Sequence, residues 1–114
     1  DIAMMVDVLH HTDHPARVLA EAARVARRGV VVKDHFRNGF LARPTLRFMD
    51  WVGNRGHDVV LPYNYLNDRQ WQTIYRKAGL VPASQQHQLG IYPPPFGWIF
   101  DRRLHFMALL VAAP

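Results

Sequence analysis

Residues 1–35, DIAMMVDVLHHTDHPARVLAEAARVARRGVVVKDH, decide the fold. A nearly unbroken apolar run fills residues 2–9, and such runs are typical of strands buried on both faces, as in parallel sheets. Residues 30–34, VVVKD, predict a second buried strand. Because a helical pattern separates the two, this stretch is a strand–helix–strand unit, so we expect parallel strands and a right-handed crossover.

The segment between these strands carries the signals of an amphipathic helix. Pro15 suits the first helical position, with Asp13 or His14 as the N-cap. Gly29 stands where a left-handed C-cap is expected. The predicted apolar stripe consists of Val18, Leu19, Ala22, Val25 and Ala26.

The strand–helix–strand unit occupies residues 1–34. An aromatic segment over residues 35–66 follows it. Glycines and prolines interrupt it, so regular structure is expected only in a short helix from Pro44 to Trp51. So many aromatic residues do not suit a linker, and we expect a packed cap segment.

The last segment, residues 67–114, predicts one helix and two strands. Asn67 is a good N-cap for a helix over 68–78. Residues 83–92 and 104–112 predict strands, and the long proline-rich connection between them indicates an antiparallel hairpin. The chain is therefore expected to form one α/β fold with a four-stranded mixed sheet.

Composition excludes several classes of protein. The 114 residues are 49% hydrophobic and 20% charged, which suits one globular domain and not a disordered chain. Without cysteine there is no disulfide framework and no thiolate site. The net charge of +5 comes from twelve arginines and two lysines that are scattered along the chain. We therefore expect a cytoplasmic protein that binds neither nucleic acid nor a membrane.

Chemistry is expected at the carboxyl ends of the two parallel strands, where open α/β sheets bind their ligands. This rule selects residues 8–11 and residues 34–37. Both stretches contain imidazole or carboxylate groups, which are the side chains most used for proton transfer near neutral pH.

The order of these features resembles the second half of class I S-adenosylmethionine-dependent methyltransferases, of the methyltransferase type 11-like kind. The resemblance continues downstream through an aromatic helix, an Ala-Gly-Leu turn and a closing hairpin, and so covers most of the chain. The matching features are Asp1, Leu9-His10-His11, Asp13-x-Pro15, Glu21-x-x-Arg24-Val25 and the strand that ends at Asp34.

The resemblance implies a Rossmann-like fold and methyl transfer from S-adenosylmethionine to a small-molecule acceptor. The family's glycine turn after a first strand, and the acidic residue after a second, have no counterpart in this sequence. We therefore expect a fragment that lacks most of the donor site and is nearly inactive alone. The donor-side residues that carry over are Met5, Val6, Asp7, Leu9 and His10.

On the acceptor side, the resemblance makes His11 or His35 a candidate general base and Asp34 its orienting group or a substrate ligand. A structural reading is open for each: His11 and Asp34 can cap their turns. His57, His87 and His105 are expected at the surface or as hydrogen-bonded core residues. The residues expected to line the acceptor pocket, or else to belong to the core, are Trp51, Asn54 and Tyr63.

Two alternative functions stay open. His11-x-Asp13-His14 matches half of the ligand signature of metallo-β-lactamase-like hydrolases, but Leu9 stands where that signature has its first histidine. We therefore expect no metal. The other alternative is a non-catalytic methyltransferase-like interaction domain, and an uncovered sheet edge could also pair the chain into a homo-oligomer.

Overall fold

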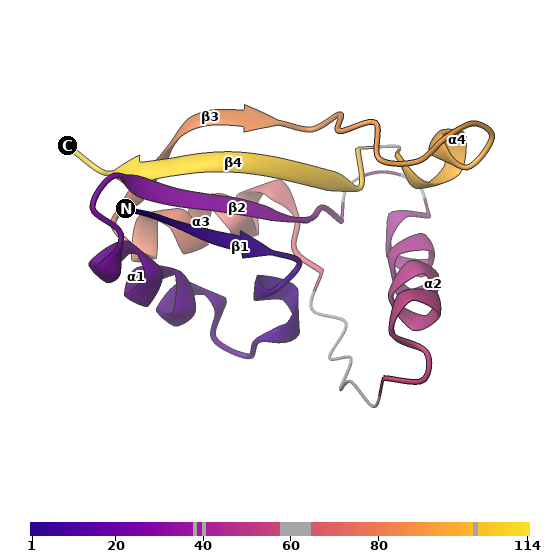
Figure 1. Ribbon diagram of the computed structural model, residues 1–114, viewed down its shortest axis with the longest axis horizontal. Coiled ribbons are helices and arrows are strands. Elements are labelled where there is room, and N and C mark those ends of the chain that lie inside the picture. The colour runs from indigo at the N-terminus through magenta and orange to yellow at the C-terminus, as the bar shows by residue number, and fades with distance from the viewer. Residues whose placement is uncertain (38, 40, 58–64, 102) are drawn as a thin grey trace.

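The computed structural model describes residues 1–37, 39, 41–57, 65–101 and 103–114. None of the helices in this part of the chain is long and apolar enough to cross a membrane. In chain order the elements are β1 (Ile2–Val6), the 3-10 turn η1 (Leu9–His11), α1 (Pro15–Val25), β2 (Gly29–His35), α2 (Ala42–Asn54), α3 (Asp68–Lys77), β3 (Leu80–Gln86), α4 (Gly97–Phe100) and β4 (His105–Ala112) (Figure 1).

The four strands form one mixed sheet in the order β1-β2-β4-β3. β1 pairs with β2 in parallel, with Ile2 opposite Gly29 and Val6 opposite Lys33. β4 pairs antiparallel with both β2 and β3. The predicted fold class, with two parallel strands and a C-terminal antiparallel hairpin, is confirmed.

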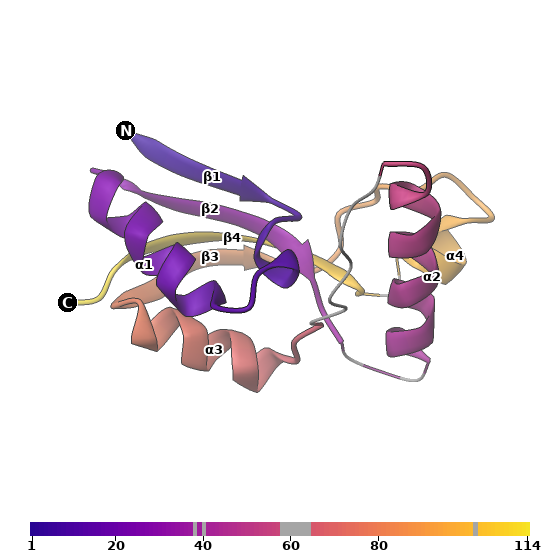
Figure 2. The same cartoon turned by 90° about the horizontal axis from the view of Figure 1, so that it is seen from below.

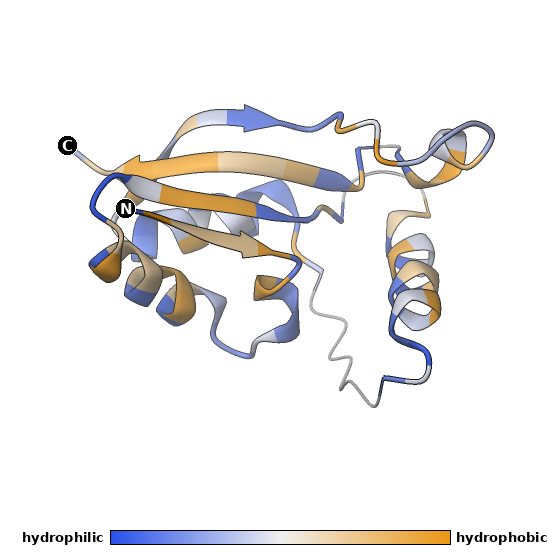
Figure 3. Ribbon diagram, in the orientation of Figure 1, coloured by the Kyte–Doolittle hydropathy of each residue, from blue (hydrophilic) through white to orange (hydrophobic). Residues whose placement is uncertain are grey.

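Helices α1 and α3 lie side by side on one face of the sheet (Figure 2). The strands direct apolar side chains toward these helices, and Figure 3 shows the central parts of β2 and β4 as strongly hydrophobic. Trp71 of α3 is fully buried, and its indole Nε1 donates a hydrogen bond to the His35 carbonyl at 3.1 Å. Other fully buried core side chains are Leu9, Leu19, Val30, Val32, Tyr75, Phe106 and Leu110.

The opposite face of β1 is open, contrary to the prediction of a strand buried on both faces. Ile2, Met4 and Val6 are 54%, 73% and 49% exposed. Their neighbours Ala3 and Met5 point to the helical side and pack against the core. In the part of the chain that the structure describes, no helix covers the face to which Ile2, Met4 and Val6 belong (Figure 2).

The start of α1 agrees with the prediction, whereas its C-terminal end differs. His14 is the N-cap residue, and Pro15 is the first helical residue as expected. The helix ends at Val25, which is exposed, and Ala26 is already extended. Gly29 therefore does not cap the helix. It opens β2 with a φ of +154°, where a Cβ atom would lie 2.7 Å from the Leu110 carbonyl oxygen.

Helix α2 is longer than the predicted helix over Pro44 to Trp51, because it spans Ala42–Asn54. Pro44 is tolerated at the third helical position, since the first four N–H groups of a helix have no intrahelical partner. Ala42, Leu46 and Asp50 are its buried residues and recur every four positions along one side of the helix.

The C-terminal segment contains the predicted helix and the two predicted strands, as α3, β3 and β4. Asn67 caps α3 through a capping box: its side chain accepts a hydrogen bond from the Gln70 N–H, and the Gln70 side chain accepts one from the Asn67 N–H. β4 agrees with the predicted 104–112 strand. β3 begins three residues earlier than predicted and ends six earlier, because its pairing with β4 starts with Leu80 opposite Ala112.

Candidate functional site

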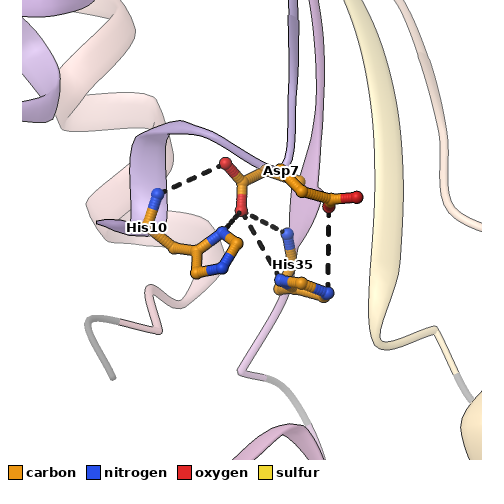
Figure 4. A group of neighbouring side chains, drawn as sticks. Asp7, His10 and His35 are labelled. Carbon is orange, nitrogen blue, oxygen red and sulfur yellow. Dashed lines mark hydrogen bonds and ion pairs between the residues drawn. The ribbon is translucent and has the colours of Figure 1, made fainter. Parts of the chain in front are cut away.

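The carboxyl ends of β1 and β2 lie side by side, as the parallel pairing requires. The Asp7 N–H donates to the Lys33 carbonyl at 2.8 Å, which extends the β1–β2 pairing by one residue. The chain after β1 thereby passes next to Asp34 and His35 at the end of β2. Figure 4 shows Asp7, His10 and His35 in this cluster.

Asp34 is the centre of the cluster and is completely buried. Its Oδ2 accepts hydrogen bonds from the backbone N–H groups of Leu9 and His10 at 3.0 and 3.4 Å. Its Oδ1 accepts one from the His35 N–H at 2.8 Å and lies 2.6 Å from the His10 Nδ1. Because a buried carboxylate needs such donors, Asp34 fixes the η1 turn against β2.

His10 lies between two carboxylates and is also buried. Its Nδ1 contacts Asp34, while its Nε2 lies 3.6 Å from Oδ1 of Asp50 in α2. Burial alone would lower the pKa of His10, but the contacts with Asp34 and Asp50 outweigh it and raise the pKa to about 9. His10 is therefore an imidazolium at neutral pH.

Asp50 connects the cluster to α2 and to the segment before α3. The Tyr65 hydroxyl donates a hydrogen bond to Asp50 Oδ2 at 2.5 Å. Burial would raise the pKa of Asp50, but the nearby His10 ring and the hydrogen bond from Tyr65 outweigh burial and lower it. Asp50 is thus held as an anion beside the His10 cation.

His35 and His105 are buried neutral imidazoles whose ring centroids lie 4.8 Å apart. Burial, followed by the positive charge on His10, lowers the pKa of His35 to about 4. Burial also lowers the pKa of His105 to about 4. Neither ring nitrogen of His105 has a hydrogen-bond partner among the described residues. His105 is therefore not the surface or hydrogen-bonded core residue that was expected.

His11 follows His10 in the η1 turn but has a different environment. It is half-buried, and its ring centroid lies 4.0 Å from that of His10. Burial and then the charge on His10 lower the pKa of His11. Among the described imidazoles of the cluster, His11 is the one that is both neutral and partly exposed.

Asp7 and Lys33 form an ion pair at the rim of the cluster. Lys33 Nζ lies 2.7 Å from both carboxylate oxygens of Asp7. The Asp7 backbone has a φ of +52°, which turns the chain sharply out of β1. Its Oδ1 also lies 3.8 Å from Nε2 of His35 (Figure 4).

The structure brings most of the predicted site residues together. The residues that meet at the ends of β1 and β2 are Asp7, Leu9, His10, His11, Asp34 and His35. Met5 and Val6 lie further back in β1, half-buried and exposed respectively.

Trp51 and Asn54, two of the predicted acceptor residues, belong to α2 and not to the strand ends where this group meets. Trp51 is 50% exposed, so it does not belong to the core, and its ring lies 5.2 Å from the guanidinium carbon of Arg55. The Asn54 side chain donates to the Asp50 carbonyl at 2.9 Å and so helps to end α2. Tyr63 lies outside the described residues.

The metallohydrolase pattern His11-x-Asp13-His14 does not form a ligand set. Asp13 and His14 are exposed. Among the described residues, the groups whose ligand atoms come together include His11 but neither Asp13 nor His14.

Sequence reasoning missed Asp50, Tyr65 and His105. A signal for Asp50 was present, because it lies eight residues after Ala42 and four after Leu46, on the side of α2 that the sequence pattern could have identified as buried. Tyr65 and His105 reach the cluster through tertiary packing, and no local pattern indicates their positions.

The described residues do not form a complete site for S-adenosylmethionine. The resemblance implies a glycine turn after a strand, where the absence of Cβ atoms lets the backbone approach the donor. Here β1 is followed by Asp7, Val8 and the fully buried Leu9. No glycine turn of this kind therefore follows β1.

Comparison with known proteins gives agreement at the level of the fold. No protein-family model matches the sequence, and no curated protein matches it either. Among solved structures, the chain matches the mitomycin 7-O-methyltransferase MmcR with a TM-score of 0.67 and 19% identity, over 99% of this chain and 30% of that one.

Two further solved structures match the fold of this chain. A putative methyltransferase from Bacillus halodurans matches with a TM-score of 0.57 and 13% identity, over 99% of this chain and 64% of its own. The arsenic(III) S-adenosylmethionine methyltransferase CrArsM from Chlamydomonas reinhardtii matches with a TM-score of 0.52 and 15% identity, over 100% of this chain and 37% of its own.

The chain spans between 30% and 64% of the length of these three structures. The sheet order and the mixture of parallel and antiparallel pairs agree with the expected partial fold. The chain therefore has the fold of part of a class I S-adenosylmethionine-dependent methyltransferase.

Proposed function

We propose that this chain is part of an S-adenosylmethionine-dependent methyltransferase and contributes the acceptor side of its site, for a small-molecule acceptor. The observation that carries the proposal is the cluster at the adjoining ends of β1 and β2, within a fold that matches a methyltransferase over 99% of the chain. Ligands of open α/β sheets bind at this position.

The proposal assigns the role of general base to His11. Transfer of a methyl group to an oxygen or nitrogen requires that the acceptor lose a proton. His10 already carries a proton at neutral pH, and His35 is almost fully buried. His11 is neutral and half-buried, so its ring can both reach an acceptor and take up a proton.

Asp34 acts in this proposal as a positioning residue. Its oxygens are occupied by the N–H groups of Leu9, His10 and His35 and by the His10 ring. It therefore holds the η1 turn that presents His11 and has no direct role toward an acceptor.

The donor requirement can be tested by calorimetry with S-adenosylmethionine. The 114-residue chain alone is expected to show no binding at micromolar concentration, because it offers one border of the donor site. The same chain, extended upstream along its gene, is expected to bind. Micromolar binding by the short chain would contradict the partial donor site, and no binding by the extended protein would contradict the proposed function.

The acceptor is to be identified with the extended protein and tritium-labelled S-adenosylmethionine, in a screen of small molecules that carry hydroxyl or amine groups. His11→Gln is expected to lower the transfer rate about 100-fold or more and to remove the acidic limb of the pH–rate profile. His14→Gln, which makes the same change on an exposed side chain three residues away, should leave both unchanged.

A non-catalytic interaction domain is the second candidate, and the open face of β1 favours it. Ile2, Met4 and Val6 present large apolar side chains that a partner would cover. If the extended protein binds S-adenosylmethionine poorly, transfers no methyl group and elutes as a complex with a second protein, this candidate replaces methyl transfer.

A further inference from the structure

We propose that His10, His11 and Asp50 form a site for a divalent transition-metal ion such as Zn²⁺. The three residues each offer one ligand atom, and these atoms lie within 4.8 Å of one another. Two ligands come from the η1 turn and the third from α2. The ion would therefore connect α2 to the turn at the end of β1. The inference goes beyond the proposed methyl transfer and does not rest on it: the general-base role of His11 belongs to the metal-free protein, because a bound ion would occupy the ring nitrogen of His11.

The ligand atoms are close to the spacing that a small ion requires. With bonds of about 2.0–2.1 Å, two ligands of a tetrahedral Zn²⁺ lie about 3.3 Å apart. Nε2 of His10 and Oδ1 of Asp50 are separated by 3.6 Å, slightly beyond hydrogen-bonding distance. The ligand atom of His11 lies within 4.8 Å of both.

Two of the proposed ligand residues have buried ring nitrogens without hydrogen-bond partners among the described residues. His10 is 1% exposed, yet within the described part of the chain its Nε2 has no hydrogen-bond partner, and neither has the buried Nδ1 of His11. Buried polar groups are rarely left unsatisfied in folded proteins. An ion held between the His10 Nε2 and the carboxylate of Asp50 would satisfy the unpartnered His10 nitrogen.

The residues behind the ligands match the surroundings of established metal sites. A histidine that binds a metal usually donates its other ring N–H to a carboxylate, which fixes the ring and raises its basicity. His10 has this arrangement, since its Nδ1 lies 2.6 Å from the buried carboxylate of Asp34. Asp50 is supported in the same way, because Tyr65 donates to Oδ2 and leaves Oδ1 facing His10.

Charge balance also favours a divalent ion. Two carboxylates, Asp34 and Asp50, flank the His10 ring at 2.6 and 3.6 Å. A divalent ion bound at this ring would balance the charge of two carboxylates. Three protein ligands would leave an open position for water or for an acceptor heteroatom, as in catalytic zinc sites.

The site can be tested by titrating the chelator-treated, purified protein with Co²⁺, followed by its visible absorption, and then displacing Co²⁺ with Zn²⁺. One saturable ion per chain is expected, with the intense absorption of a four- or five-coordinate site. His11→Gln and Asp50→Asn should each weaken binding on the order of 100-fold, and Tyr65→Phe about 10-fold. Circular dichroism of each variant checks that it is folded.

The matched controls are Asp13→Asn and His14→Gln, which make the same chemical changes on exposed side chains of the neighbouring loop. They should bind Co²⁺ as the unmodified protein does. Absence of a saturable site in the unmodified protein overturns the inference, as does an equal loss of affinity in the controls. Since neither S-adenosylmethionine nor an acceptor is present, these outcomes are independent of whether the protein transfers methyl groups.

Discussion

At the scale of single residues, the buried carboxylate of Asp34 is the group on which the cluster depends. Asp34→Asn replaces an oxygen acceptor by an amide group and leaves the His10 cation without its nearest counterion. Removing one partner of a buried pair typically costs about 3–5 kcal/mol, so the free energy of unfolding should fall by about that amount.

Urea denaturation of the unmodified protein and of Asp34→Asn measures this loss. Glu21→Gln is the control, because the Glu21–Arg24 pair is fully exposed and should not measurably affect stability. If Asp34→Asn proves as stable as Glu21→Gln, the structural role assigned to Asp34 is wrong.

His105 is a residue whose polarity costs stability. Both of its ring nitrogens are buried without partners among the described residues. His105→Leu removes this unsatisfied polar surface at similar volume and should raise the free energy of unfolding by about 1 kcal/mol. His105→Asn, which keeps a buried polar group and loses ring packing, should lower it; denaturant titration that finds both variants destabilised would contradict the argument.

At the scale of elements, Gly29 decides how closely β2 can approach β4. A Cβ atom at this position would lie 2.7 Å from the Leu110 carbonyl, and the φ of +154° is one that other residues rarely adopt. Gly29→Ala should therefore destabilise the protein by about 1–3 kcal/mol.

Gly53 provides the comparison, because it lies inside α2 and a Cβ atom added there would meet no atom of the described residues within 4 Å. Gly53→Ala should stabilise the protein by up to about 1 kcal/mol, since alanine favours helices. Thermal unfolding of the two variants, which carry the same chemical change, should give Tm shifts of opposite sign; shifts of the same sign would refute the assignment for Gly29.

The elements also show how far the sequence predicts the fold. The parallel pairing of β1 with β2 and the Asn67 cap of α3 were predicted, because apolar runs and capping residues are local signals. The length of α2 was underestimated, since the prediction began the helix at Pro44 although a proline is allowed throughout the first turn.

The candidate site could be predicted only in part, because local sequence signals place the strand ends but not the helix that packs against them. His10, His11, Asp34 and His35 were placed together because strand ends in a parallel pair meet at one edge. Asp50 joins them from a helix that the sequence does not position relative to the sheet. The apolar run of β1 predicted burial on both faces, but one face is exposed, because an apolar run gives no information about which element covers it.

At the scale of the whole molecule, the buried histidines predict a stability maximum near pH 6.5 in the metal-free protein. Because folding raises the pKa of His10 from 6.5 to about 9, the folded state binds more protons in this interval and stability falls as pH rises. His35 and His105 have pKa values of about 4 in the folded state, so between pH 6.5 and 4 the unfolded state binds more protons and stability falls as pH decreases.

Chemical denaturation at a series of pH values, with a chelator present, measures both limbs. The alkaline limb should reach a slope of about 1.4 kcal/mol per pH unit, the effect of one proton. His105→Leu should reduce the acidic limb and leave the alkaline limb unchanged. A stability curve that is flat between pH 6.5 and 9 would show that His10 is not charged in the folded protein.

The η1 turn gives two consecutive histidines opposite properties. A 3-10 turn rotates the chain by about 120° per residue, so consecutive side chains start in different directions, although these two ring centroids lie only 4.0 Å apart. His10 is buried beside carboxylates, whereas His11 is half-buried. Deleting Val8 would shift the pair by one position, so that His11 takes the place of His10 and His10 takes the place of the buried Leu9. The spacing from the strand, more than the presence of a double histidine, therefore sets which imidazole is the cation.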